Sequence, residues 1–226
     1  WEWPNEGFAK VYRTPDGGDT WTTAATLTAS DGAKNDYFGR SVAVAGDTIF
    51  VGAYGDDDDG TNSGSVYVFR TTDGGATYDE VETLKASSPK AGANFGNALA
   101  ADGDTLVIGA YSDNSYKGAV YVFRKSGSTY AQVARLTGSG VASDDEFGTS
   151  VDVSGDTIVV GTEYTDAAFV YRTSDGGATW AAVTTLEGSD DFGQSVAIDG
   201  DTIVIGASGG DATYVYRTSD GGATYD

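Results

Sequence analysis

The sequence predicts an all-β protein, a β-propeller of four-stranded antiparallel blades, on two observations. One unit recurs along the chain and opens with Phe-Gly at Phe38, Phe95, Phe147 and Phe192. Their spacings of 57, 52 and 45 residues (95−38, 147−95 and 192−147) fit propeller blades and exceed leucine-rich or tetratricopeptide repeats. In addition, Val, Ile, Thr, Tyr and Phe fill the apolar runs, while Gly, Asp and Ser fill the gaps.

Each unit is expected to contain four strands. In the first full unit these are Ser41–Ala45, Thr48–Ala53, Ser65–Arg70 and 81–84. The second is a continuous apolar run, which is typical of a strand buried on both faces. Gly46-Asp47 separates the first two strands, and because glycine tolerates a positive φ, a tight hairpin of the primed type is expected. Later copies of the third strand are 119–124, 168–172 and 213–217, and of the fourth 133–136 and 183–186.

The predicted propeller region is a single one, residues 1–226, with about four and a half blades. These cover residues 1–28 (half a blade), 38–86, 95–137, 147–187 and 192–226 (incomplete). Both ends supply a third strand, at 8–13 and 213–217, so they do not complete one blade together. The chain is therefore expected to be part of a larger propeller, for which seven blades in all are possible, or to close its blades against another copy.

The composition narrows the function classes. A formal net charge of −21 argues against nucleic acid or an anionic membrane surface as a partner. The chain has no His, the usual general base, and no Cys, so thiolate chemistry and disulfides are excluded. We predict that the protein is not an enzyme and has no catalytic residues.

The units resemble FG-GAP repeats, the blades of the integrin α-subunit propeller. The resemblance rests on Phe-Gly followed by Gly-Ala, as at Phe38 and Gly52, and it extends over nearly the whole chain. The acidic branch found in secreted microbial and algal proteins is most similar, especially over residues 27–69. The resemblance implies a propeller, often of seven blades, used extracellularly for adhesion or ligand binding. Two features depart from the pattern: the Pro after Gly-Ala is absent everywhere, and the third unit has Gly161-Thr162.

Calcium is the candidate cofactor. Integrin-type blades hold calcium between the first and second strands, but here that loop is only Gly-Asp, too short to supply six to eight oxygens. A different acidic loop lies between the second and third strands of the first full unit. Its candidate ligands are Asp56, Asp57, Asp58, Asp59 and Asn62, and the alternative is a solvated loop that keeps the surface soluble. Further carboxylates that could join are Asp31, Asp36, Asp144 and Asp145.

The turn after the third strand carries a second motif. Residues 173–180 follow Thr-x-Asp-x-Gly-x-Thr-Trp and resemble the Asp-box hairpin of sialidases and sortilin-type propellers, with copies at 14–21, 71–78 and 218–225. We expect the Asp to accept backbone N–H bonds, a structural role. Sialidase chemistry would need three converging Arg, whereas five occupy one repeated position: Arg13, Arg70, Arg124, Arg172 and Arg217. A sialidase-like, glycan-active propeller is therefore kept only as an alternative.

Aromatic residues in or beside the loops suggest a binding surface. They are Tyr54, Tyr111, Tyr116 and Tyr164, which could stack on sugar rings or pack against a neighbouring blade. We predict a secreted protein, extracellular or at the cell surface, that acts as an adhesion, binding or structural module. A protein partner or self-assembly is the main expectation; a building block of an extracellular filament or coat and a glycan binder are the alternatives.

Overall fold

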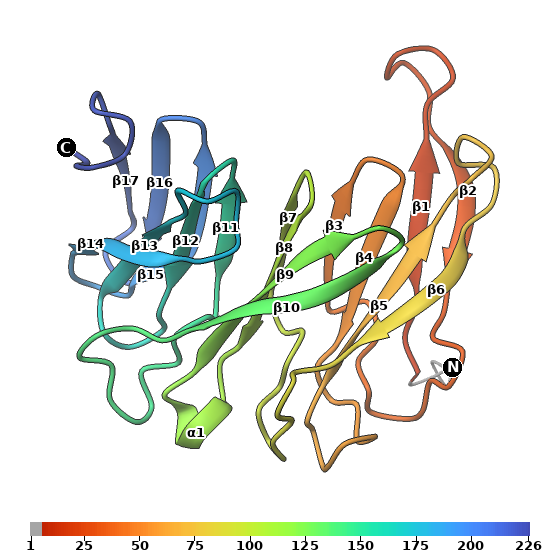
Figure 1. The fold of residues 1–226 in the computed structure, drawn as a ribbon, viewed down its shortest axis with the longest axis horizontal. Helices are drawn as coiled ribbons and strands as arrows, with labels where there is room; N and C mark the ends of the chain where they lie inside the picture. The colour runs from red at the N-terminus through yellow and green to blue at the C-terminus, as the bar shows by residue number, and fades with distance from the viewer. Residues whose placement is uncertain (1–5) are drawn as a thin grey trace.

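Five antiparallel sheets form the protein in this computed structural model, which describes residues 6–226 (Figure 1). The first sheet has two strands, β1 (Ala9–Arg13) and β2 (Thr22–Leu27). The next three have four strands each: β3 (Ser41–Ala45), β4 (Thr48–Ala53), β5 (Ser65–Arg70) and β6 (Asp79–Leu84); β7 (Leu99–Asp102), β8 (Thr105–Ala110), β9 (Ala119–Ser126) and β10 (Thr129–Leu136); β11 (Val151–Ser154), β12 (Thr157–Gly161), β13 (Ala167–Arg172) and β14 (Ala181–Glu187). The last sheet has three strands, β15 (Phe192–Asp199), β16 (Thr202–Ala207) and β17 (Ala212–Arg217).

The sheets are arranged as propeller blades. Each is a meander in which consecutive strands pair, and neighbouring sheets contact through their first strands, β3 with β7, β7 with β11 and β11 with β15. Figure 1 shows them side by side, from β1 and β2 at one end to β17 at the other. The predicted all-β propeller is confirmed. One helical turn, α1 (Asp113–Tyr116), lies between β8 and β9.

The observed strand boundaries agree best with the predicted ones where the apolar pattern of the sequence is strongest. β3, β4 and β5 begin and end where the sequence predicts. The fourth strands begin earlier than predicted, as β6 does at Asp79, because a bulge in the pairing with the third strand lets polar residues extend the ladder. The second strands β4, β8 and β12 are buried along their whole length. In β16 buried and half-buried residues alternate, since only one of its faces has a neighbouring blade.

The hydrophobic core lies between blades, and the phenylalanine of each Phe-Gly is at its centre. Phe95 is almost fully buried and packs edge-on against two third-strand rings, with centroid distances of 5.3 Å to Tyr121 and 6.0 Å to Phe123. Phe147 makes the same pair of contacts in the next blade. Each buried ring contributes about 1.5–3 kcal/mol of transfer free energy. Phe95 also belongs to one core cluster with Phe50 and Val66 of the preceding blade, so the Phe-Gly repeat contributes to the packing between blades.

The glycines of the repeat lock adjacent blades together. Within a blade, the N–H of Gly96 donates to the carbonyl of Gly109 at 3.0 Å. Between blades, the carbonyl oxygen of Gly148 lies so close to Gly109 that a Cβ on Gly109 would collide with it. Gly52 and Gly161 face the carbonyls of the following Phe-Gly in the same way. Glycine is required at these positions because the neighbouring carbonyl oxygen leaves no room for a Cβ atom.

Turns close the blades at the end opposite α1. The glycine of each Gly-Asp hairpin has a positive φ, as predicted, for example +56° at Gly46. In the turn after the third strand, Asp175 Oδ1 accepts the N–H of Thr179 at 2.9 Å and its Oδ2 accepts the Thr179 hydroxyl at 2.7 Å. These hydrogen bonds from the hydroxyl and N–H of Thr179 lower the pKa of Asp175 to about 2. The predicted structural role of this Asp is observed.

Two of the repeated arginines bind the turns that follow the third strands. Arg70 Nη2 donates to the carbonyl of Ser128 at 3.0 Å, and Arg172 Nη1 donates to the carbonyl of Gly221. In both cases the acceptor belongs to the turn of the following blade. These two arginines therefore lie at separate interblade contacts, as the repeat predicts. Within residues 6–226, no helix has the length and apolar character needed to cross a membrane.

Candidate functional site on the loop face

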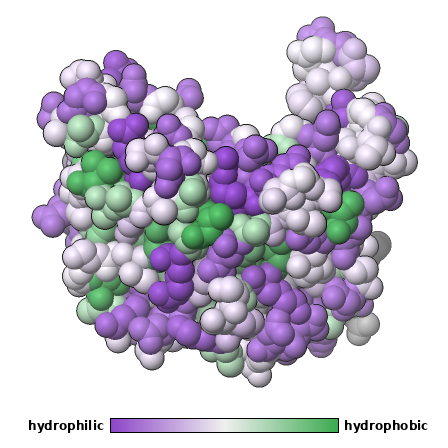
Figure 2. All heavy atoms as spheres, in the orientation of Figure 1, coloured by the Kyte–Doolittle hydropathy of each residue, from purple (hydrophilic) through white to green (hydrophobic). Residues whose placement is uncertain are grey.

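Two sets of loops meet at one end of the propeller, the end that carries α1 in Figure 1. One set joins the second strand to the third, and the other precedes each Phe-Gly. The N–H of Gly55 in the first set donates to the carbonyl of Asp36 in the second at 3.1 Å, and Glu163 and Asp145 make the equivalent bond at 3.1 Å. We call this end the loop face. Figure 2 shows a molecule whose visible surface is mostly hydrophilic or neutral, with apolar residues in small separate groups.

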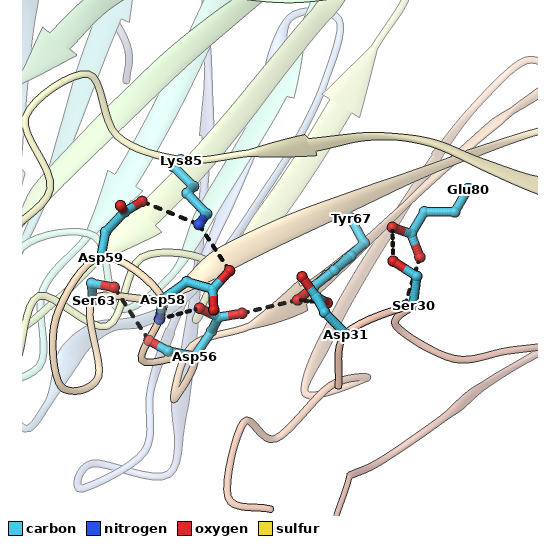
Figure 3. Close-up of polar contacts among 9 residues, drawn as sticks. All are labelled: Ser30, Asp31, Asp56, Asp58, Asp59, Ser63, Tyr67, Glu80 and Lys85. Carbon is cyan, nitrogen blue, oxygen red and sulfur yellow. Dashed lines mark hydrogen bonds and ion pairs between the residues drawn. The ribbon is translucent and has the colours of Figure 1, made fainter. Parts of the chain in front are cut away.

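The acidic loop of the first full blade places two carboxylates on one phenol (Figure 3). The Tyr67 hydroxyl lies 2.7 Å from Asp31 Oδ1 and 2.9 Å from Asp56 Oδ2, and Asp56 is buried. A phenol carries one proton, so only one carboxylate receives it at a time. Burial, followed by the hydrogen bonds to these two carboxylates, raises the pKa of Tyr67 above its usual range.

The other predicted calcium ligands point elsewhere. Lys85 Nζ lies 3.1 Å from Asp58 Oδ2 and 3.2 Å from Asp59 Oδ2 (Figure 3). Asp57 Oδ1 accepts the backbone N–H of Asn62 at 2.6 Å. Within residues 6–226, the structure contains no group of three or more acidic side chains arranged to hold a metal ion. The five predicted ligands are thus not brought together, and calcium stays a prediction.

The carboxylates that do come together are partly ones that the sequence offered as additional ligands. Asp31 and Asp56 share Tyr67, and Asp36 lies close by. Burial, with the nearby charges of Asp56, Asp57 and Asp31, raises the pKa of Asp36 above its usual range. Any cation at this place would therefore contact Asp31 and Asp56 first. Asp145 instead accepts the N–H of Ala142 within its own loop at 2.5 Å.

Calcium is expected to raise the melting temperature, and a chelator to lower it, because a cation bound only by the folded state stabilises that state. The shift should be about 5 °C when calcium is well above its dissociation constant. Differential scanning calorimetry of wild type, Asp56→Asn and Asp47→Asn measures it, with Asp47 in a distant hairpin turn as the control. If millimolar calcium and chelator both leave the wild-type melting temperature unchanged, the calcium prediction is wrong.

A pocket of about 420 Å³ opens on the loop face between the first three full blades. Its walls come from equivalent positions of successive units: the residue after Phe-Gly, the residue after Gly-Ala or Gly-Thr, and the residue before Phe. These are Arg40, Asn97 and Thr149; Tyr54, Tyr111 and Glu163; and Glu146. The pocket therefore lies where first strands of neighbouring blades meet, and we call it the axial pocket.

The pocket combines an aromatic platform with two carboxylates, Glu146 and Glu163, that form no ion pair within residues 6–226. Tyr37 stacks on Tyr54 with a centroid distance of 4.9 Å and an interplanar angle of 5°, which fixes the Tyr54 ring. Burial, then the charges of Glu163 and Asp144, raises the pKa of Glu146. Glu163 accepts a hydrogen bond from Gln194 Nε2 at 2.9 Å. The pocket can thus offer ring faces together with amide, hydroxyl and carboxylate groups.

A model of the FG-GAP repeat matches four segments of the chain, residues 21–69, 78–123, 130–180 and 186–225. The chain belongs to the FG-GAP repeat family. Among solved structures, the crystal structure of Saccharomyces cerevisiae Sqt1 is similar, with a TM-score of 0.51 and 11% identity over 98% of this chain and 68% of that one. At that identity the likeness shows the fold alone. No curated protein matches the sequence.

Two lining residues of the axial pocket of this FG-GAP propeller were predicted from the sequence. Tyr54 and Tyr111 line it, as their place after Gly-Ala allows. Tyr116 lies near Tyr111, at 6.3 Å between centroids, while Tyr164 is 65% exposed; neither lines the pocket. Arg40, Asn97, Thr149, Glu146 and Glu163 were missed. These residues could have been found from the sequence, because the repeated positions that they occupy carry different side chains in different units.

Replacing Glu146 by Gln should stabilise this FG-GAP propeller at pH 7. Because its pKa is raised in the folded state, wild-type Glu146 favours folding below its unfolded pKa of about 4.3 and loses that contribution as pH rises through the folded value. At pH 7 the free energy of unfolding of the variant should exceed that of wild type by roughly 0.5 kcal/mol, a small difference because solvent partly screens the repulsion between Glu146 and its acidic neighbours. Near pH 3 the two free energies should be equal. Urea unfolding at both pH values measures this, with Glu187→Gln as the charge-matched control. An equal change in both variants would contradict it.

Proposed function

We propose that this FG-GAP propeller is a non-enzymatic extracellular binding module that holds a glycan in the axial pocket. The observation that carries the proposal is the composition of that pocket. Its lining positions are equivalent in every blade, yet they hold Arg, Asn and Thr in one set and Tyr, Tyr and Glu in another. Elsewhere the units repeat the same packing residues. Divergence at one concave place is what a binding site on a repeat scaffold requires.

A glycan fits the chemistry of these walls. Tyr54 and Tyr111 supply ring faces against which the apolar face of a sugar can pack. Asn97, Thr149 and Glu163 supply donors and acceptors for hydroxyl groups. A mostly polar pocket with a few aromatic surfaces suits such a ligand better than a purely apolar one.

A binding role without catalysis is supported by the separation of the reactive residues. Two of the repeated arginines, Arg70 and Arg172, donate to the turn of the following blade, at the end away from the pocket. The pocket holds one arginine, Arg40, so the three-arginine carboxylate clamp of sialidases cannot form there. FG-GAP repeats also occur in extracellular proteins, and the net charge of −21 suits an exposed, soluble surface.

A glycan array tests the proposal. Labelled wild-type protein should bind a defined set of glycans, and Tyr54→Ala and Tyr111→Ala should lose most of that signal because each removes a ring face. Tyr12→Ala is the matched control, since Tyr12 is an exposed tyrosine of β1 outside the pocket. Absence of any wild-type signal, or equal signals from all three variants, would reject glycan binding at this pocket. Turnover of a bound glycan would reject the non-enzymatic part.

A further inference from the structure

A second pocket on the loop face, of about 220 Å³, has the opposite character to the rest of the molecule. It lies between α1 and the chain that follows β10. Lys117, Arg135, Asn114 and Thr137 are among its lining residues. Two of the 13 basic residues of a strongly acidic chain therefore line one small pocket.

The basic residues at this pocket outnumber the one carboxylate that pairs with them. Asp113, whose side chain is fully buried, accepts from Arg135 Nη2 at 2.7 Å and from Lys90 Nζ at 2.6 Å. One carboxylate thus faces two cations, and Lys117, which lines the pocket, adds a third basic side chain. Within residues 6–226, Lys117 forms no ion pair. One of these three basic side chains is enough to neutralise the buried Asp113, so the other two need another explanation.

The preceding blade shows that the fold does not demand this arrangement. Tyr121 donates to Asp113 as Tyr67 donates to Asp56, at the same position of the repeat. In that blade the phenol meets a second carboxylate, Asp31, where the following blade has cations. Equivalent places thus carry opposite charge. The positive charge at the second is a property of that blade, which suggests a ligand of its own.

We propose that this pocket binds an oxyanion, either free sulfate or the sulfate ester of a sugar. The bonds from Arg135 to Asp113 use Nε and Nη2, which leaves Nη1 for a ligand. Lys117 Nζ and the Asn114 amide supply the other donors, and hydrogen bonds from ionised donors to an oxyanion are the strong kind. Backbone strain is consistent with this role. Asn114, Ser115 and Tyr116 all have left-handed φ, between +56° and +61°, a conformation that L-residues rarely adopt.

Titration with sodium sulfate, at ionic strength held constant with sodium chloride, tests the proposal. Backbone amide resonances of residues 114 and 117 should shift and saturate in the millimolar range. Lys117→Gln should weaken binding by roughly five-fold, the effect of one partly exposed charge. Lys125→Gln is the control, because it removes the same charge from the same blade at the opposite end of β9. The Lys117 backbone N–H donates to the carbonyl of Asp113, a bond that Lys117→Gln keeps, and the Asp113 carboxylate pairs with Lys90 and Arg135 instead of Lys117, so this variant should remain folded.

The second arm compares glucose 6-sulfate with glucose. Binding of the ester but not of glucose supports an ester ligand, and binding of sulfate without the ester supports a free ion. A response that does not saturate, or equal weakening in Lys117→Gln and Lys125→Gln, would overturn the proposal. The comparison of Lys117→Gln with Lys125→Gln separates these outcomes from the axial pocket, because Lys117 lines this pocket and not the axial one.

Discussion

Replacing Gly109 by Ala should be among the most destabilising changes in the protein, at about 3 kcal/mol. The added Cβ would collide with the carbonyl oxygen of Gly148 in the next blade, and backbone cannot move aside as a flexible side chain can. For a domain of this size the melting temperature should fall by roughly 6–12 °C. Thermal and urea unfolding measure the loss.

The last unit provides the matched control. Gly206 occupies the same position in its own blade, but a Cβ there would meet chiefly the Ser195 hydroxyl, the far end of a rotatable side chain. Gly206→Ala should therefore cost less than about 1 kcal/mol. If both variants lose the same stability, the interblade contact is not what requires glycine, and the packing explanation of the repeat is wrong.

Asp113→Asn and Asp56→Asn should change stability in different directions, although the two residues are equivalent. Asp113→Asn leaves Lys90 and Arg135 facing each other, at a cost of about 2 kcal/mol, less than for a fully buried pair because both cations reach solvent. Asp56→Asn removes one of two carboxylates that share one proton and places an amide donor against the Tyr67 oxygen, which leaves the phenol proton for Asp31. In chelator it should be neutral or raise stability by up to about 1 kcal/mol.

The pH dependence of Asp113→Asn provides an independent check. Burial acts to raise the pKa of Asp113, and the hydrogen bonds from Lys90, Arg135 and Tyr121 outweigh it, so this pKa lies below its usual range. Wild-type stability from Asp113 is therefore present above the unfolded pKa of about 3.9 and is lost as pH falls through the folded value. The difference between wild type and variant should shrink in acid. If the stability difference between wild type and Asp113→Asn grows below pH 4, the ion pairs of Asp113 are not the cause of the difference.

The fold could be predicted from the sequence because each unit restates the same local signals. Thr48–Ala53 reads as a strand buried on both faces, and Gly46-Asp47 as its turn, and both are observed. The fourth strands were predicted too short, since polar residues such as Asp79 and Glu80 carry no apolar pattern. The left-handed turn at Asn114 was also missed, because its conformation depends on tertiary contacts around the buried Asp113.

The candidate sites were predicted less well, and the reason is geometric. Four consecutive aspartates predicted a calcium site at residues 56–59. Side chains of neighbouring residues point in different directions, however, and Lys85 forms ion pairs with Asp58 and Asp59. Asp31 reaches Asp56 only because separate loops meet at the loop face. The axial pocket likewise joins residues about 50 positions apart, such as Arg40, Asn97 and Thr149. Comparing units position by position would have marked these residues.

The central claim, that the axial pocket is the binding site, is tested most directly by the affinity of the strongest array glycan for wild type, Tyr111→Ala and Tyr12→Ala. Isothermal titration calorimetry gives this affinity for each folded variant. Loss of one stacked ring should weaken binding by about tenfold in Tyr111→Ala. Tyr12→Ala should bind like wild type. Wild-type affinity in Tyr111→Ala would place the glycan elsewhere and contradict the account.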